Sequence, residues 1–169
     1  ISLNEVGGEP GEFGIDLRSY HEFIAHRYST HAYSMNATST HDSKRGEDVR
    51  SRINVFSEMP DVWESEVKSW SRINHAGRKK HEDRPVPDRN DEYFIYQTLA
   101  GTFPSPPCDY VDYVRRIKEY MIKSVREAKV HTAWIKPDTE YEENLLLFID
   151  RILFPQENNR FLERFIPFQ

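Results

Sequence analysis

The sequence has little of what would tie it to a disulfide framework, a membrane or a nucleic acid. Cys108 is the single cysteine among 169 residues, so the chain cannot form an internal disulfide bond. The longest strongly apolar run, residues 145–149, is far below the roughly 20 residues that span a bilayer. A formal net charge of -5 argues against a nucleic-acid partner, because phosphate binding needs a basic face. We therefore expect neither a membrane nor a nucleic-acid partner.

Patterns typical of cofactor and metal sites are also missing. Four of the seven glycines fall within residues 7–14, but no Gly-Lys-Ser/Thr follows them, which favours a plain loop over a phosphate cradle. His21, His26 and His31 recur every five residues, a spacing that turns a helix by about 500° and does not bring the rings together. We predict no metal and no cofactor. The absence of a signal peptide and the single cysteine favour a soluble, cytoplasmic protein.

Size and composition limit what the chain can form on its own. The chain is shorter than the roughly 250 residues of an eight-stranded α/β barrel. Its apolar fraction of 37% is low for an autonomous domain, while its aromatic fraction of 13% is high. That balance suits a segment that packs against missing parts, and Ile1 in place of an initiator Met agrees with an excised piece.

Apolar residues recur at helical spacing over most of the chain, which predicts a mainly α fold. The first helix covers residues 16–28, with Asp16 as its N-cap. A second apolar stripe runs over residues 49–56. The only convincing strand lies at residues 32–39, which have no helical period, and the charged, proline-containing residues 75–90 are expected to form an exposed connection.

Cap residues set the boundaries of the later helices. Asp61 with Glu64 resembles a capping box, and Asp88 or Asp91 can cap the next helix. For the polar residues 88–93, capping by Asp91 is a simpler explanation than contact with a substrate, which stays open. Two longer helices begin after Asp109 and after Asp138, and a short apolar segment with Phe161, Leu162 and Phe165 closes the chain.

A dense polar block at residues 38–50 follows the predicted strand and contains the pair His41-Asp42. Catalytic groups must be held rigidly, and the end of a strand provides that support. In the alternative interpretation, Asp42 is the N-cap of a helix whose first turn includes Glu47, and His41 is merely exposed.

The block 38–50 reads Thr-Ser-Thr-His-Asp-Ser-Lys-Arg-Gly-Glu-Asp-Val-Arg. It resembles the last short motif of the α-amylase family, in the variant of the maltooligosyltrehalose synthases. Residues 3–8, 87–93, 96–99 and 126–132 resemble further segments of these enzymes in the same order. The resemblance therefore covers nearly the whole chain.

This resemblance implies a C-terminal-half fragment of an α-amylase-type (β/α)8 barrel enzyme. Residues 1–48 would be the late part of the catalytic barrel, ending in one short strand that carries His41 and Asp42. Residues 49–169 would be a helical insertion. The implied partners are a maltooligosaccharide and the remainder of the barrel.

The implied reaction is an intramolecular glucosyl transfer that converts the reducing-end α-1,4 linkage of a maltooligosaccharide into an α,α-1,1 linkage, giving maltooligosyltrehalose. Asp42 would stabilise the transition state, and His41, Lys44 and Arg45 would bind sugar hydroxyls. For Lys44 and Arg45, a solvated charge is an equal alternative. The other two catalytic carboxylates would lie outside this chain, so we predict that the isolated fragment is inactive.

Other interpretations remain open at this point. The chain is alternatively a non-catalytic helical module that binds glucan or protein, or part of an α-amylase-like hydrolase. Trp63 and Trp70 have the spacing of core residues, with sugar stacking as the alternative. His131 either lines a sugar cleft or ends a helix whose following Trp134 packs into the core.

Overall fold

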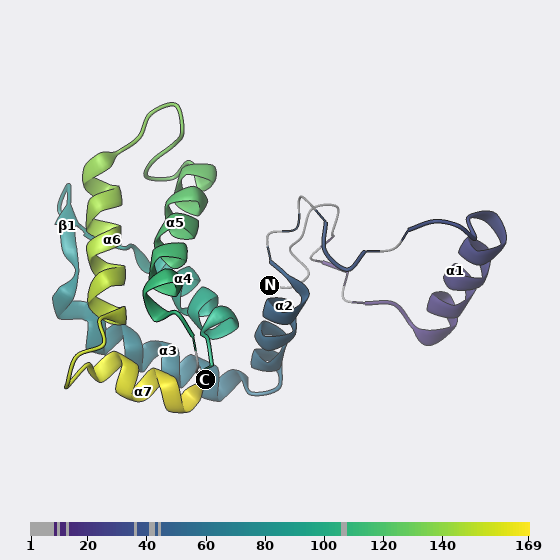
Figure 1. The fold of residues 1–169 in the computed structure, drawn as a ribbon, viewed down its shortest axis with the longest axis horizontal. Coiled ribbons are helices and arrows are strands. Elements are labelled where there is room, and N and C mark those ends of the chain that lie inside the picture. The colour runs from purple at the N-terminus through teal and green to yellow at the C-terminus, as the bar shows by residue number, and fades with distance from the viewer. Residues whose placement is uncertain are drawn as a thin grey trace. The chain divides into compact units, whose positions relative to one another are not determined.

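The computed structural model describes residues 9, 11–12, 14–35, 37–40, 43, 45–105 and 108–169. The chain divides into two compact units, Ile1–Glu58 and Met59–Gln169. The elements of both are mostly helical, as predicted (Figure 1). No helix in the described ranges has the length and apolar content needed to cross a membrane.

The described residues of the first unit form two α-helices and bury very little apolar surface. Helix α1, Leu17–Thr30, begins as predicted at the N-cap Asp16, whose carboxylate accepts the Ser19 N–H at 3.0 Å. It buries no residue, so its apolar face lies open to solvent. Helix α2, Glu47–Asn54, continues into the 3-10 turn η1, Val55–Ser57. Ile53 is the one buried residue of α2.

The strand predicted at residues 32–39 is wrong for the part of this segment that the structure describes. Residues 32–33 form a turn, the described residues 34–40 lie in loop and bend conformation, and their side chains are exposed. A strand needs a neighbour to accept and donate its backbone hydrogen bonds, and no strand in the described part of this unit supplies one.

The second unit packs five helices around an aromatic core. Its helices are α3 (Pro60–Asn74), α4 (Arg89–Thr102), α5 (Tyr110–Ala128), α6 (Thr139–Leu153) and α7 (Arg160–Phe168), with the 3-10 turn η2 (His75–Gly77) after α3. Helices α5 and α6 lie side by side, while α3 and α7 contact each other at one end of them (Figure 1).

Trp70 occupies the centre of this core with no exposed surface. The rings of Tyr96, Phe165 and Phe168 surround it at centroid distances of 5.4, 5.3 and 5.3 Å, each edge-on. Trp63 is also nearly buried. The prediction of core positions for both tryptophans is confirmed, and their alternative as sugar platforms is wrong.

Residues 75–90 contain a hairpin where an exposed connection was predicted. Strands β1 (Lys79–His81) and β2 (Arg84–Val86) pair antiparallel, and the turn residues Glu82 and Asp83 have φ values of 48° and 62°. Two left-handed residues twist a two-residue turn in the sense that a hairpin needs. The sequence hides this turn because it carries Glu-Asp instead of the usual Asn-Gly, and because Pro85 lies within a strand.

Of the four later cap predictions, two are confirmed as made, one is decided between its alternatives and one is wrong. Asp109 and Asp138 cap α5 and α6 as predicted, accepting N–H groups three residues ahead at 3.0 Å each. Asp88 and not Asp91 caps α4, accepting the Asp91 N–H at 2.8 Å. The capping box at Asp61 is wrong, because Pro60 already occupies the first turn and Met59 is the N-cap.

Candidate functional site

The predicted catalytic motif falls largely outside the described residues. His41, Asp42 and Lys44 belong to the undescribed positions, and only Arg45 of the predicted set is described, half-buried just before α2. Helix α2 starts at Glu47 with Gly46 in the N-cap position. The alternative in which Asp42 is that N-cap is therefore wrong, while the catalytic and binding roles of the four residues stay predictions.

Helix α2 holds the chain that leads into this motif. The Thr38 hydroxyl donates to the Glu47 carboxylate, and the Arg50 guanidinium donates to the Thr38 carbonyl. Arg50 also donates to the Ser39 hydroxyl at 3.3 Å. Glu47 and Arg50 of α2 thus hold Thr38 through its hydroxyl and its carbonyl, and Arg50 holds Ser39 through its hydroxyl.

Thr40 and Ser43, on either side of the His-Asp pair, are bonded to each other. The Ser43 N–H donates to the Thr40 carbonyl at 3.1 Å, and the Thr40 N–H donates to the Ser43 hydroxyl at 2.9 Å. Two local hydrogen bonds therefore link Thr40 to Ser43.

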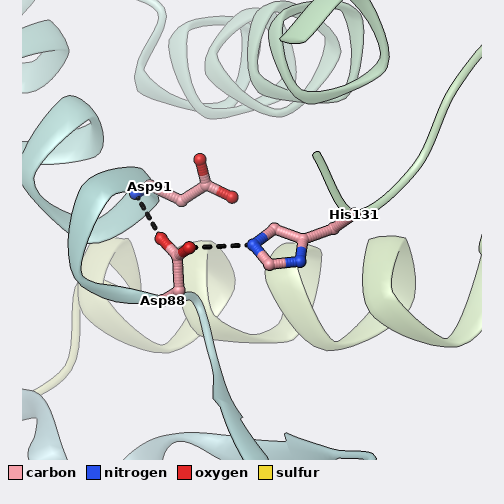
Figure 2. A group of neighbouring side chains, drawn as sticks. All are labelled: Asp88, Asp91 and His131. Carbon is pink, nitrogen blue, oxygen red and sulfur yellow. Dashed lines mark hydrogen bonds and ion pairs between the residues drawn. The ribbon is translucent and has the colours of Figure 1, made fainter. Parts of the chain in front are cut away.

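A second polar site lies in the helical unit, where the start of α4 meets the loop after α5 (Figure 2). The Asp88 carboxylate caps α4 through Oδ1, and its Oδ2 lies 2.8 Å from His131 Nε2. An ionised carboxylate only accepts, so Nε2 carries the proton of this hydrogen bond. The His131 ring stacks on Tyr141 at a centroid distance of 4.4 Å, and the Tyr141 hydroxyl donates to Asp91 Oδ2.

The two aspartates of this site are shifted in opposite directions. Burial acts to raise the pKa of Asp88, but the Asp91 N–H and His131 outweigh it and lower that pKa. Burial raises the pKa of Asp91. The hydrogen bond from Tyr141 acts to lower that pKa and the negative charge of Asp88 acts to raise it, and the net shift is upward. Burial and the neighbouring Asp91 raise the pKa of Tyr141. Asp88 therefore carries the firmer negative charge, and Tyr141 acts as a donor.

Asp88, Asp91 and His131 also have the composition of a metal-ligand group. One potential ligand atom from each lies within 4.8 Å of the others, and no other such group is found among the described residues. Each of the three nevertheless has an internal partner: the Asp91 N–H and His131 bond Asp88, and Tyr141 bonds Asp91. Hydrogen bonding alone accounts for the arrangement, which joins α4, α6 and the loop between α5 and α6.

Next to this site, Glu142 in the first turn of α6 forms an ion pair and a further hydrogen bond. Arg126 donates to both oxygens of Glu142, at 2.8 and 2.6 Å, and Thr132 donates to Glu142 Oε1 at 2.6 Å. The guanidinium carbon of Arg126 lies 4.9 Å from the ring centroid of Trp134. Trp134 is 55% exposed, so its placement in the core, one of the two alternatives for this loop, is wrong.

A third polar network lies beneath the contact of α3 and α4. Glu92, only 3% exposed, accepts from Ser71 at 3.0 Å, from Arg78 at 2.5 Å and from the Tyr96 hydroxyl at 2.8 Å. An open hollow of about 620 Å³ lies above it, and none of the predicted site residues lines that hollow. The network neutralises a buried carboxylate and stabilises the packing of the two helices.

Sequence reasoning missed both networks of the helical unit. Asp88, Asp91 and His131 were each considered, but singly, as caps or cleft residues. Their contacts join positions 43 and 50 residues apart. Periodicity reports neighbours three or four residues apart and carries no signal for such pairs.

No family model matches the chain. A curated relative, the putative maltooligosyl trehalose synthase of Mycobacterium tuberculosis, is 37% identical over 153 residues, which is 90% of this chain and 19% of the relative. A solved structure of a hypothetical maltooligosyl trehalose synthase from Sulfolobus tokodaii is 42% identical, with a TM-score of 0.80, over 99% of this chain and 21% of that one. The synthase of Arthrobacter ramosus is 31% identical, with a TM-score of 0.73, over 98% of this chain and 20% of that one.

These relatives form one class of large enzymes, and the chain spans about a fifth of their length. Sequence and fold agree over nearly all of the chain. It is homologous to one segment of the maltooligosyl trehalose synthases, and the resemblance seen in the sequence is confirmed.

Proposed function

We propose that this chain is the segment of a maltooligosyltrehalose synthase that supplies one catalytic carboxylate and, after it in the sequence, a helical unit. The parent enzyme rearranges the reducing end of a maltooligosaccharide from an α-1,4 to an α,α-1,1 linkage. The observation that carries the proposal is 37% identity over 90% of the chain to one such enzyme, together with a TM-score of 0.80 to another.

In this proposal, Asp42 stabilises the transition state of a double displacement that retains the anomeric configuration, and His41, Lys44 and Arg45 bind sugar hydroxyls. Such chemistry needs a nucleophile and an acid/base in addition, about 5 to 5.5 Å apart. Those two carboxylates come from the rest of the parent, so the isolated chain is inactive. The bonds from α2 to Thr38 and Ser39 support the role of the motif, because they hold the chain just before it.

The proposed placement makes residues 1–48 the late part of a (β/α)8 barrel and residues 49–169 an inserted helical subdomain. The open apolar face of α1 supports this placement, because a helix with no buried residue needs a surface to cover it. The missing four-fifths of the parent offers that surface. The proposed substrate is neutral, and the proposed location is the cytoplasm.

The test uses the parent enzyme and maltopentaose. Wild type is compared with Asp42→Asn while the loss of reducing ends and the appearance of free glucose are followed. We expect the wild type to remove reducing ends and the variant to lose at least about 10²-fold in rate, as when one central catalytic group is removed.

Two results would reject the proposal. Release of glucose without loss of reducing ends would assign the parent to the hydrolases. An active Asp42→Asn variant would mean that the motif does not act in catalysis, as expected of a binding module.

A further inference from the structure

The three tryptophans of the chain have opposite environments. Trp63 and Trp70 are 7% and 0% exposed, whereas Trp134 is 55% exposed. Trp134 lies in the loop between α5 and α6. This loop and the helices α3 and α7 lie at opposite ends of α5 and α6 (Figure 1). Core packing therefore does not explain the presence of this large apolar ring.

The exposure of Trp134 does not come from a loose loop. Ala133 and Lys136 form an isolated β-bridge around it, with N–H to O distances of 3.2 and 3.1 Å. Thr132 donates to Glu142 at 2.6 Å and accepts the Asp138 N–H at 2.9 Å. Both ends of the turn that carries Trp134 are thus tied to the start of α6.

The ring itself is held by a fixed cation. The guanidinium carbon of Arg126 lies 4.9 Å from the ring centroid, and two hydrogen bonds to Glu142 hold the guanidinium in place. Arg126 therefore covers one part of the ring, and more than half of the residue faces solvent. A supported, half-open indole is a surface on which a flat apolar face can stack.

A glucose ring has such a face, because its axial C–H groups gather on one side while its hydroxyls point outward. We propose that Trp134 is a stacking platform for a glucose unit of an α-1,4-glucan. The ligand class rests on the proposed function, which makes a maltooligosaccharide the substrate of the parent enzyme. Trp134 is not part of the motif at residues 41–45, so this platform is a separate contact with the sugar chain.

The first experiment measures how acrylamide quenches the tryptophan fluorescence of the full 169-residue chain. Because Trp63 and Trp70 are buried, the quenchable fraction reports Trp134. We expect maltoheptaose to protect that fraction, with a dissociation constant on the order of millimolar, as for one small contact. Mannitol at the same mass concentration is the control for a general polyol effect. Equal quenching with and without maltoheptaose overturns the proposal.

The second experiment measures retardation of variants in native gels that contain soluble starch. Trp134→Ala is expected to weaken retardation by about tenfold in apparent affinity, the loss of one apolar contact, whereas Trp134→Phe keeps most of it. Ile135→Ser is the matched control, since Ile135 is 98% exposed in the same turn but has no ring. Equal loss in Trp134→Ala and Ile135→Ser would mean unspecific apolar adhesion and would overturn the platform. Thermal midpoints of the three variants check that each is folded.

The difference in acrylamide quenching between the wild-type parent enzyme and its Trp134→Phe variant tests whether protein covers the ring. If Trp134 is already shielded from acrylamide before any sugar is added, the sugar platform is rejected and the ring instead contacts another part of the enzyme. The two proposals fail separately. A parent that forms no rearranged product rejects the proposed function, whereas rearrangement together with unchanged starch retardation of Trp134→Ala rejects only the platform.

Discussion

His131 Nε2 lies 2.8 Å from Asp88 Oδ2, the oxygen of the α4 cap that the helix leaves free. The start of α6 repeats this arrangement: His81 Nε2 lies 2.9 Å from Asp138 Oδ2, while Asp138 Oδ1 accepts the Tyr141 N–H at 3.0 Å. Each cap aspartate thus joins its helix to a histidine from another segment. The hairpin, the loop after α5 and two helix starts are thereby connected through two aspartate–histidine pairs.

The first prediction concerns the pH dependence of stability at His81. Burial acts to lower the pKa of His81, but the carboxylates of Asp138 and Glu140 outweigh it and raise that pKa. A pKa that is higher in the folded state gives stability that is complete below the unfolded value of about 6.5 and is lost as pH rises through the folded value. His81→Gln should therefore destabilise the chain more at pH 5.5 than at pH 8.5.

Urea midpoints at both pH values measure this difference. His75→Gln is the control, because His75 is exposed in η2. Wild-type and His81→Gln midpoints that stay equally far apart at the two pH values would contradict a contribution from the His81 charge.

The second prediction concerns the hydrogen bond from Tyr141 to Asp91. Tyr141→Phe removes the donor and leaves a half-buried carboxylate without it, which costs about 1–3 kcal/mol. Tyr120→Phe is the matched control, because that ring stacks on Phe94 at 6.0 Å and this variant keeps the stacked ring. The free energy of unfolding of both variants is measured by urea titration, and equal losses would show that the Asp91 bond contributes nothing particular.

The third prediction concerns Asn159, the N-cap of α7. Its side-chain oxygen accepts the N–H groups of Phe161 and Leu162 at 3.1 and 3.0 Å, and its amide nitrogen donates to the carbonyls of Ile152 and Phe154 at 3.1 and 2.8 Å. Asn159→Asp keeps the oxygen that caps α7 but replaces the donating nitrogen by a second carboxylate oxygen. That oxygen would face the two backbone carbonyl oxygens in a buried position, where they repel each other. It should cost at least about 2 kcal/mol of unfolding free energy, despite aspartate being a good cap.

The reciprocal change at another cap is the control for Asn159→Asp. Asp109 in α5 only accepts, from the Asp112 N–H at 3.0 Å, and lies in an exposed place. Asp109→Asn should cost no more than about 0.5 kcal/mol. A mild Asn159→Asp variant would mean that its two donated bonds do not stabilise the joint between α6 and α7.

The helical part of the fold was predictable because its signals are local. Asp16, Asp109 and Asp138 precede apolar residues at helical spacing, and each caps a helix in the structure. The spacing of Trp63 and Trp70 likewise placed both in the core. Periodicity and capping involve residues within one or two turns, so a single sequence contains them.

The remaining features depend on partners far along the chain. Residues 32–39 have no helical period, but strand formation requires a second strand, and the described residues of the first unit form none. The choice between Asp88 and Asp91 as cap depended on Tyr141, 50 residues after Asp91, whose hydroxyl binds the Asp91 side chain. For the motif at residues 41–45, the family resemblance came from the sequence, and the roles of its residues remain to be tested by substitution.

The last prediction concerns the independence of the helical unit. Among the described residues with buried apolar side chains, Ile53 is the only one before residue 59. Residues 59–169 should therefore fold alone, with a thermal midpoint within about 5 °C of the full chain, which corresponds to a difference of about 1 kcal/mol. Residues 1–58 should show little helix by circular dichroism, because an isolated 14-residue helix such as α1 is marginal in water. Unfolded 59–169, or strongly helical 1–58, would contradict this division. If residues 59–169 fold alone and residues 1–58 do not, then residues 1–58 are the part of the chain that requires contact with another protein surface. Most of that part, residues 1–48, is the segment that we assign to the barrel.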